Sequence, residues 1–283
     1  MTKHSKSKVP IAIGGLGGSG TRVLSTILQQ VGFYIGGDIN ESADNLWFTL
    51  LFKQSGINNL NESDFKKRVA HFAAAMTHDQ AFDIDEPFIA KLALKDRPLH
   101  NSAWLHQRVK TFLEYKESTQ HRTERWAWKE PNTHICIDRL KIFIPQLKYI
   151  HLMRHGLDMA FSENLNQLAL WGEDVLGQPV ELTPKYALAY WVKVHENLDI
   201  KLSKFKKTET LIIHFEDLCE YPHSTISKIL KFSDITTSAN QLDALCAGVK
   251  RPDTFGRYKH YDLSQLNKDD IKSLEKFNYH AIK

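Results

Sequence analysis

The sequence predicts an α/β protein whose central parallel sheet is covered by helices on both faces. Short apolar segments alternate along the chain with longer segments whose apolar residues recur at helical spacing. The 283 residues are enough for one large α/β domain, or for a core with helical insertions. Charged or glycine-rich residues follow the predicted strands, and ligands of such sheets bind outside the carboxyl ends of the strands. One converged site is therefore expected beyond Ile13, Trp128, Met153 and His214.

Residues 9–35 predict a strand, a glycine loop, a helix and a second strand. The apolar run Val9–Ile13 ends in glycine, which is typical of a buried parallel strand. Gly32 stops the helix that follows the loop, and Phe33–Ile35 is expected to form the second strand. The helix itself is predicted from apolar residues at helical spacing, which are Val23, Leu24, Ile27, Leu28 and Val31.

The remainder of the chain alternates between the two kinds of segment. From about Asn40 to Lys116 the pattern is mostly helical and polar. No repeat, low-complexity tract or linker separates two domains, so a single domain is expected. In chain order, the later predictions are strands at 124–131 and 147–155, a helix at 156–170, a loop at 172–184, a long helix through Trp191 and Phe205, a strand at 210–217 and further helices.

The composition restricts the ligand and the partners. A net charge of +4 suits an anionic small ligand but lacks the concentrated basic stripe of a nucleic-acid-binding protein, so no nucleic-acid partner is expected. The three cysteines are scattered without a CxxC pair, and neither a metal site nor a disulfide framework is expected. The basic N-terminus precedes too short an apolar run for a signal peptide, and no segment approaches about 18 apolar residues. A cytoplasmic protein without a membrane span is therefore expected, with its oligomeric state left open.

The segment "IAIGGLGGSGTRVL" (Ile11–Leu24) admits three interpretations as a phosphate-binding loop. Gly15–Gly20 matches the GxGxxG fingerprint of NAD(P)-binding oxidoreductases, with Asp38 near the distance of a ribose-binding acid. A Walker A loop fits less well, because Thr21 stands in place of the lysine and Arg22 in place of the magnesium-binding hydroxyl. In the third interpretation, backbone amides and hydroxyls at a helix N-terminus bind a tetrahedral anion.

This third interpretation is supported by a resemblance that extends along most of the chain. The loop Ser19-Gly20-Thr21 resembles the loop with which sulfotransferases bind the 5′-phosphosulfate of 3′-phosphoadenylyl sulfate (PAPS). In "YIHLMRHGLDMAFS", Arg154 at a strand end and Ser162 on the next helix are similar to the family's 3′-phosphate site, where a guanidinium and a hydroxyl share one phosphate. "RWAWKEP" resembles the NKDP segment of the tyrosylprotein branch, whose lysine acts on the bridging oxygen, and this implies such a role for Lys129.

Two later segments extend the resemblance. "IIHFEDL" (Ile212–Leu218) is similar to the YEDL strand and helix of the family, and "TFGRYKHY" to the late loop that closes over the 3′-phosphate. The resemblance implies a three-layer, P-loop-NTPase-like fold and one sulfotransferase domain over 1–283, with a helical insertion around 42–123 and a closing segment at 250–283. It implies these donor-binding residues: Gly17, Gly18, Ser19, Gly20, Thr21, Arg22, Arg154, Ser162, Arg257 and Lys259.

The loop departs from the family pattern at one position. Most members have a lysine or arginine directly before the Ser-Gly of the loop, and this chain has Gly18 there. The missing charge must come from elsewhere, and Lys129 is expected to supply it. Arg22, which follows Thr21 as in the heparan branch, is a second source.

The resemblance also implies a reaction. A sulfuryl group would pass by in-line displacement from PAPS to a hydroxyl or amine of a carbohydrate or small-molecule acceptor, and adenosine 3′,5′-bisphosphate (PAP) would be released without a metal. Glu41, shortly after the second predicted strand, is expected to be the general base, with Asp38, His155, His134 and Glu86 as alternatives. Two other functions remain open, namely an NAD(P)-binding oxidoreductase and a non-catalytic nucleotide-binding protein. Aromatic residues that could line the acceptor pocket, but are more simply core, are Trp47, Phe48, Trp104, Trp126 and Trp171.

Overall fold

The computed structural model describes residues 9–117 and 125–280. These residues fall into two compact units. Unit 1 contains the chain up to Ile13 together with Leu24–Tyr149, and unit 2 contains Gly14–Val23 together with the chain from Ile150 onward. Each unit is described below by itself.

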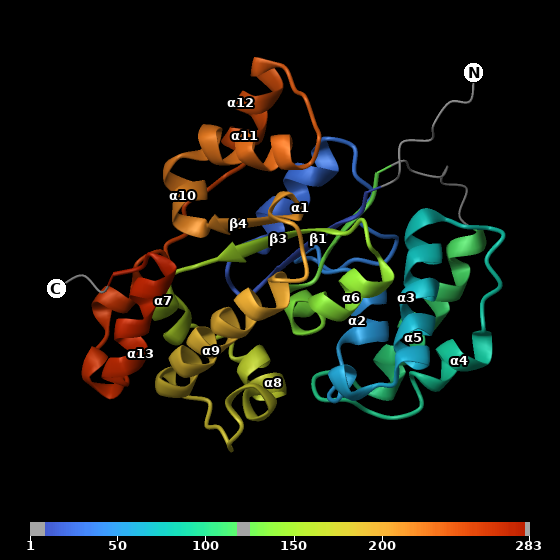
Figure 1. Cartoon of the computed structure of the whole chain (residues 1–283), viewed down its shortest axis with the longest axis horizontal. Helices are drawn as coiled ribbons and strands as arrows, with labels where there is room; N and C mark the ends of the chain where they lie inside the picture. Colours follow the sequence, from blue (N-terminus) through green and yellow to red (C-terminus); the bar gives the residue numbers. More distant parts are fainter. Residues whose placement is uncertain (1–8, 118–124, 281–283) are drawn as a thin grey trace. The chain divides into compact units, whose positions relative to one another are not determined.

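A four-stranded sheet with the strand order β2-β1-β3-β4 confirms the predicted α/β class (Figure 1). Strands β1 and β2 are parallel, with Ile13 of β1 opposite Lys129 of β2. Every residue of β1 and β2 is buried, as the apolar runs predicted. The four strands are β1 (Ile11–Gly15), β2 (Ala127–Lys129), β3 (Lys148–Met153) and β4 (Thr210–His214).

The second predicted strand, Phe33–Ile35, is largely wrong. Only an isolated bridge joins Tyr34 to Trp126, next to β2. The Tyr34 N–H donates to the Arg125 carbonyl at 3.1 Å, and the Ala127 N–H donates to the Tyr34 carbonyl at 2.8 Å. The segment lies along β2 but is too short to form a ladder, because the turn at Gly36-Gly37 follows at once.

The helices of unit 1 confirm the helical prediction for residues 40–116. Four of them begin at an asparagine or aspartate whose side-chain oxygen accepts a backbone N–H of the first turn, which explains where they start. These caps are Asn45, Asn61, Asp85 and Asn101. The helices of this unit after α1 (Thr21–Gln30) are α2 (Leu46–Phe52), α3 (Glu62–Thr77), α4 (Glu86–Lys91), α5 (Ser102–Leu113) and α6 (Ile137–Phe143).

Aromatic side chains form the core of unit 1. Phe72 contacts both Trp128 and Phe48 edge to face, with ring centroids 5.3 Å and 5.6 Å apart. Trp126 stacks on Trp128 at 5.5 Å. Of the five aromatic residues proposed for an acceptor pocket, Trp47, Phe48 and Trp126 are at most 3% exposed and belong to this core, and Trp104 is half-buried. The fifth, Trp171, is 2% exposed and belongs to unit 2.

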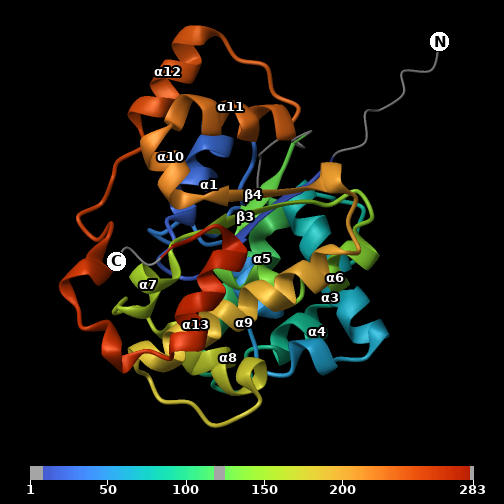
Figure 2. The same ribbon diagram turned by 60° about the vertical axis from the view of Figure 1, so that its left-hand side comes forward.

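The helices of unit 2 form two groups, in which α7, α8 and α13 pack on α9 and α11 packs on α10 and α12 (Figure 2). Its helices after β3 are α7 (Gly156–Ala160), α8 (Asn166–Leu176), α9 (Pro184–Leu202), α10 (Phe215–Glu220), α11 (Pro222–Phe232), α12 (Ala239–Ala247) and α13 (Lys268–Ser273).

Three predicted boundaries in unit 2 are corrected by the structure. The helix predicted for 156–170 is two helices, α7 and α8. The loop predicted to begin at residue 172 begins instead at Gly177, which ends α8 in a left-handed conformation with φ of 68°. The last strand ends at His214, because Phe215 already opens α10.

Candidate active site

The glycine loop of unit 2 connects the end of β1 to the start of α1. Gly18 and Gly20 have φ angles of 91° and 94°, a conformation that side chains rarely adopt. A Cβ atom at Gly20 would also lie only 2.6 Å from the Phe215 ring. Gly18, where the resemblance led us to expect a basic residue, therefore has a backbone conformation that favours glycine.

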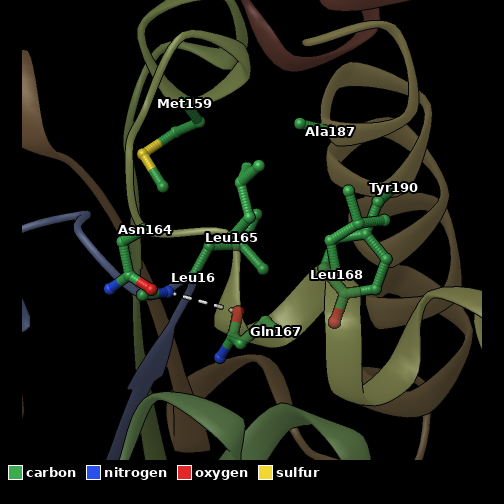
Figure 3. A pocket seen from close by; sticks show the side chains of 9 residues that line it. Leu16, Met159, Asn164, Leu165, Gln167, Leu168, Ala187 and Tyr190 are labelled. Carbon is green, nitrogen blue, oxygen red and sulfur yellow. Dashed lines mark hydrogen bonds between the residues drawn. The ribbon is translucent and has the colours of Figure 1, made fainter. Parts of the chain in front are cut away.

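Gln167 holds the loop from α8. The Gly17 N–H donates to Gln167 Oε1 at 3.2 Å (Figure 3), and Gln167 Nε2 donates to the Gly15 carbonyl at 3.5 Å. One buried amide thus bonds the backbone on both sides of Leu16. Sequence analysis missed Gln167, since 150 residues separate it from Gly17 and no local pattern marks it.

The hydroxyl groups at the start of α1 are buried beside the loop. Ser19 and Thr21 are 1% and 4% exposed. Among the described residues, the Ser19 hydroxyl has no hydrogen-bond partner, although an unmade buried hydrogen bond is costly. Arg22, the second residue of α1, is exposed. The loop therefore fits an anion bound at a helix N-terminus.

Arg154, one residue beyond β3, is 3% exposed and reaches the glycine loop. Its Nη1 donates to the Gly18 carbonyl at 3.3 Å, and its Nη2 forms an ion pair with Asp158 at 3.0 Å. Nη2 also donates to the Thr254 carbonyl. Arg154 Nε is buried and has no partner within the described part of the chain. Arg154 thus contacts the glycine loop as predicted, but most of its N–H groups already donate to protein acceptors.

Asp158 organises the late loop that sequence analysis assigned to the 3′-phosphate. Its carboxylate accepts the Gly256 N–H at 2.8 Å and the Tyr258 N–H at 3.4 Å. Arg257 donates to the Phe161 carbonyl at 3.4 Å, and its pKa is lowered by burial and by the charge of Arg154. Sequence analysis overlooked Asp158, although its spacing of four residues from Arg154 on a helix start was a usable signal.

The last donor residues lie at the edges of this cluster. Ser162 Oγ accepts the Asn164 N–H at 3.2 Å, and it lies 3.5 Å from the place of a Cβ built on Gly18. Lys259 is exposed. Unit 2 therefore brings Gly18, Arg154, Ser162 and the 254–258 loop together from three separate stretches of the sequence.

Lys129 lies at the end of β2 in unit 1, opposite Ile13, the residue before the glycine loop. It is 3% exposed. Its ammonium group donates to the Ser42 carbonyl at 2.9 Å and forms an ion pair with the Asp44 carboxylate. Because an ammonium carries three N–H groups, one remains for a further acceptor.

Glu41 occupies an exposed turn that Asn40 stabilises. Asn40 Oδ1 accepts the N–H groups of Ser42 and Asp44, at 3.0 Å and 2.8 Å. Lys129 bonds to Ser42 and Asp44, which lie next to Glu41 in the sequence. The segments that carry the two predicted catalytic residues are therefore in contact within unit 1. Asp44, the carboxylate that contacts Lys129, was not predicted.

The alternative bases have structural contacts of their own. Asp38 pairs with Arg108 at 3.3 Å and accepts a hydrogen bond from the Thr111 hydroxyl. The carboxylate that a dinucleotide site would use to bind the ribose is therefore engaged by these two side chains. His155 caps α7 through Leu157, and burial lowers its pKa. In unit 1, His134 Nδ1 lies 2.8 Å from the Pro131 carbonyl, and Glu86 is exposed in the first turn of α4.

The described residues show neither a metal-binding cluster nor a membrane-spanning helix. They contain no group of three or more histidine, cysteine, aspartate or glutamate side chains arranged to hold a metal ion. Within residues 9–117 and 125–280, no helix is both long enough and apolar enough to cross a membrane.

Comparison with known proteins gives consistent results. A model described as the sulfotransferase family matches residues 10–239. The sulfotransferase domain of the curacin biosynthetic pathway superposes with a TM-score of 0.52 at 14% identity, over 97% of this chain and 98% of that one. The corresponding domain of the Synechococcus PCC 7002 olefin synthase gives 0.51 at 18% identity, over 96% of both chains. A sulfotransferase from Alicyclobacillus acidocaldarius gives 0.50 at 13% identity, over 96% of both chains. No curated protein matches the sequence.

Proposed function

Because the chain belongs to the sulfotransferase family, we propose that it transfers a sulfuryl group from PAPS to a hydroxyl or amine of a small-molecule or carbohydrate acceptor. In this proposal the whole chain is one sulfotransferase domain, with 42–123 as a helical insertion and 250–283 as a closing segment. The observation that carries the proposal is the contact between Arg154 Nη1 and the Gly18 carbonyl, at 3.3 Å, with the Ser162 hydroxyl next to Gly18. A cation and a hydroxyl then lie beside one glycine loop.

Each donor-binding residue has a proposed role. The amides of the loop, with Ser19 and Thr21, hold the 5′-phosphate, and the buried Ser19 hydroxyl gains the partner that it lacks among the described residues. Arg154, Ser162 and Arg257 hold the 3′-phosphate. The Nη2 group of Arg154 bonds to Asp158 and Thr254, and the Nε group has no partner among the described residues, so Nε is a donor for this phosphate. Arg22 and Lys259 are exposed cations at the edges of the site.

Two residues of unit 1 carry the proposed chemistry. PAPS supplies the activated sulfuryl group, and the chain supplies the proton acceptor and the charge that stabilises the leaving oxygen. Glu41 takes the proton of the acceptor hydroxyl as its oxygen bonds to sulfur. Lys129 donates its third N–H to the bridging oxygen, whose bond to sulfur breaks. Asp44 and the Ser42 carbonyl orient that ammonium group.

Nucleotide binding tests the donor site. Isothermal titration should show that PAP binds far more tightly than adenosine 5′-monophosphate, which lacks the 3′-phosphate. Arg154→Lys and, as a more exposed variant, Arg257→Gln should each reduce that preference about tenfold or more, because a hydrogen bond to a charged group contributes about 1.5–3 kcal/mol. Equal affinity of the wild-type protein for the two nucleotides would refute the assignment. Release of PAP from PAPS in the presence of an acceptor library then separates an enzyme from a non-catalytic binding protein.

A further inference from the structure

Unit 1 contains a cleft whose residues have no role in the reaction as described above. Its volume is about 640 Å³, and it is lined by residues of α3 and α4 and by the segment that follows α4. Four cationic side chains line it, Arg68, Lys91, Lys95 and Arg97. The two carboxylates of the lining, Asp64 and Asp96, do not balance them.

Both carboxylates are used by neighbouring helix starts. Asp64 accepts the Asn61 side-chain amide at 2.9 Å, and Asp96 accepts the Ser102 N–H at 2.6 Å. Among the described residues, none of the four cations forms an ion pair with a carboxylate. The four cations of the lining therefore outnumber its two carboxylates, which leaves the cleft with a surplus of positive charge.

Arg68 is the innermost of these cations. It is 6% exposed, and it donates through Nη1 to the Leu51 carbonyl at the end of α2. Its Nε is buried and has no partner among the described residues. Burial and the charge of Arg97 lower the Arg68 pKa to about 10, and burial with Lys53 and Arg97 lowers the His100 pKa to about 4. Burial is the first cause of both shifts, the neighbouring cations add to it, and the charge of Asp64 acts in the opposite direction on Arg68.

Helix capping accounts for only part of this arrangement. Arg97 donates to the Leu50 carbonyl at 2.8 Å and to the Leu92 carbonyl at 2.6 Å, so that Arg68 and Arg97 together cap the C-terminal end of α2. Capping uses neither Arg68 Nε nor the ammonium groups of Lys91 and Lys95. The three residues that carry these donors line the same cleft.

The cleft also presents apolar surface beside the cations. Phe88, Leu92, Leu94 and Pro98 belong to its lining. Leu94 is 66% exposed, so its side chain contributes little burial of apolar surface to the stability of the fold. A ligand that satisfies both parts of the lining would carry an anionic group and an apolar portion.

Helix α2 connects the cleft with the proposed catalytic lysine. At one end of α2, the Asn45 N–H donates to the Lys129 carbonyl at 2.7 Å. At the other end, Lys53 lies 3.3 Å from Glu130, and Gln54 already lines the cleft. A helix of seven residues is about 10 Å long. An acceptor that reaches from the cleft toward Lys129 therefore has to extend about 10 Å, the length of α2.

We propose that this cleft binds the acceptor through a carboxylate, sulfate or sulfonate group and an adjoining apolar portion, so that the acceptor is an amphiphilic organic anion. The inference rests on the proposed function, since it names the class of its acceptor. Arg68, Lys91 and Lys95 bind the anionic group, and Phe88 and Leu94 contact the apolar portion.

Titration with three probes tests the cleft by itself. The probes are 2-naphthalenesulfonate, its neutral analogue 2-naphthalenemethanol, and inorganic sulfate, and binding is followed by isothermal titration without any nucleotide. The sulfonate should bind at least tenfold more tightly than either of the others. Lys91→Gln/Lys95→Gln should weaken its binding about tenfold, because two exposed charges each contribute up to about 1 kcal/mol. Lys66→Gln/Lys110→Gln, which removes two exposed lysines of unit 1 outside this cleft, is the matched control and should change nothing.

The outcomes separate the cleft from the donor site. Unchanged sulfonate binding in the Lys91/Lys95 variant, or displacement of the sulfonate by PAP, would overturn the proposal. PAP affinity should be equal in the variant and the wild type. If PAP fails to bind at all while the sulfonate binds through Lys91 and Lys95, the proposed function fails and the anion-binding cleft remains.

Turnover tests the acceptor class. With PAPS as donor, 6-hydroxynaphthalene-2-sulfonate should be sulfated with a KM at least tenfold below that of 2-naphthol. Lys91→Gln/Lys95→Gln should raise the KM for the hydroxysulfonate about tenfold and leave kcat unchanged. Equal KM values for the charged and neutral phenols would contradict an anionic acceptor.

Discussion

Arg154 and Asp158 form an ion pair of 3.0 Å in which the two side chains are 3% and 2% exposed. The same guanidinium bonds to the carbonyls of Gly18 and Thr254, and the same carboxylate accepts the N–H groups of Gly256 and Tyr258. This ion pair at the start of α7 therefore bonds to both the glycine loop and the 254–258 loop and holds them together. A ligand that binds Arg154 therefore meets a side chain whose position is already determined.

Asp158→Asn should destabilise the protein, although the aspartate and asparagine side chains have nearly the same size. The substitution leaves Arg154 buried without a counter-ion, and breaking a buried pair in this way costs about 3–5 kcal/mol. Urea unfolding should show a loss in the free energy of unfolding of about 3 kcal/mol. Arg154→Met/Asp158→Asn should be more stable than Asp158→Asn alone, and a double variant that is less stable would contradict an ion pair as the cause.

Gln167 should affect donor binding without touching the donor. Gln167→Leu removes both bonds to the glycine loop, at Gly17 and Gly15, and should weaken PAP binding about tenfold, since each bond contributes about 0.5–1.5 kcal/mol. Gln167→Glu keeps the acceptor for the Gly17 N–H but places a carboxylate beside the Gly15 carbonyl and the anion-binding loop, so its affinity for PAP should be the lowest of the three. Calorimetry of the three proteins checks this order. An affinity for PAP that is the same in all three would show that the loop holds its conformation without Gln167.

Glu41 and Lys129 should separate catalysis from binding. Glu41→Gln should lower kcat by about 10²–10⁴ and leave PAP affinity unchanged, because a general base acts only on the acceptor proton. Lys129→Met should lower kcat by about 10²–10³. Asp38→Asn serves as the comparison, because Asp38 pairs with Arg108, and its effect should appear in stability rather than in kcat. Full turnover in Glu41→Gln would assign the base elsewhere.

The buried pair His151 and His195 should make stability depend on pH. Their Nε2 atoms are 3.2 Å apart, His195 Nδ1 lies 2.7 Å from the Trp191 carbonyl, and burial with the charge of His214 lowers the His195 pKa to about 4. Because the unfolded histidine has a pKa of about 6.5, the unfolded state takes up the proton first as the pH falls. Stability is fully present above pH 6.5 and is lost toward pH 4, with a loss of about 2 kcal/mol between pH 7.5 and 5.

Denaturant unfolding at the two pH values checks this expectation. His195→Asn should reduce the pH dependence by most of that amount. The exposed His223 offers a control, and His223→Gln should retain the wild-type slope. A slope that is the same in all three proteins would show that other groups cause the pH dependence.

Most elements of the fold followed from local pattern, and the wrongly predicted strand at 33–35 shows one way in which local pattern fails. The runs that became β1 and β3 are apolar and end in glycine or charge, and both form strands near the predicted bounds. The apolar run at 33–35 looks the same locally, yet it has room for only one bridge to Trp126. Local pattern indicates which segments can pair, and it does not indicate how much of a neighbouring strand is available to them.

The candidate site was predictable residue by residue but not contact by contact. Lys129 and Arg154 were singled out because charges follow strands, and both lie at strand ends. Their partners, Asp44 and Asp158, were missed, as was Gln167. A buried cation needs a counter-charge, but the sequence does not show which cation is buried.

By itself, the sequence determined the α/β class, the position of the glycine loop between a strand and a helix, and the helical character of residues 40–116, because apolar periodicity and glycine placement act over a few neighbouring residues. Only the tertiary structure decided that Asp158 and Thr254 share Arg154, that Gln167 holds the glycine loop, and that Asp44 faces Lys129. Those contacts depend on burial, which removes water as a partner and so makes each donor and acceptor depend on whichever side chain the fold brings within reach.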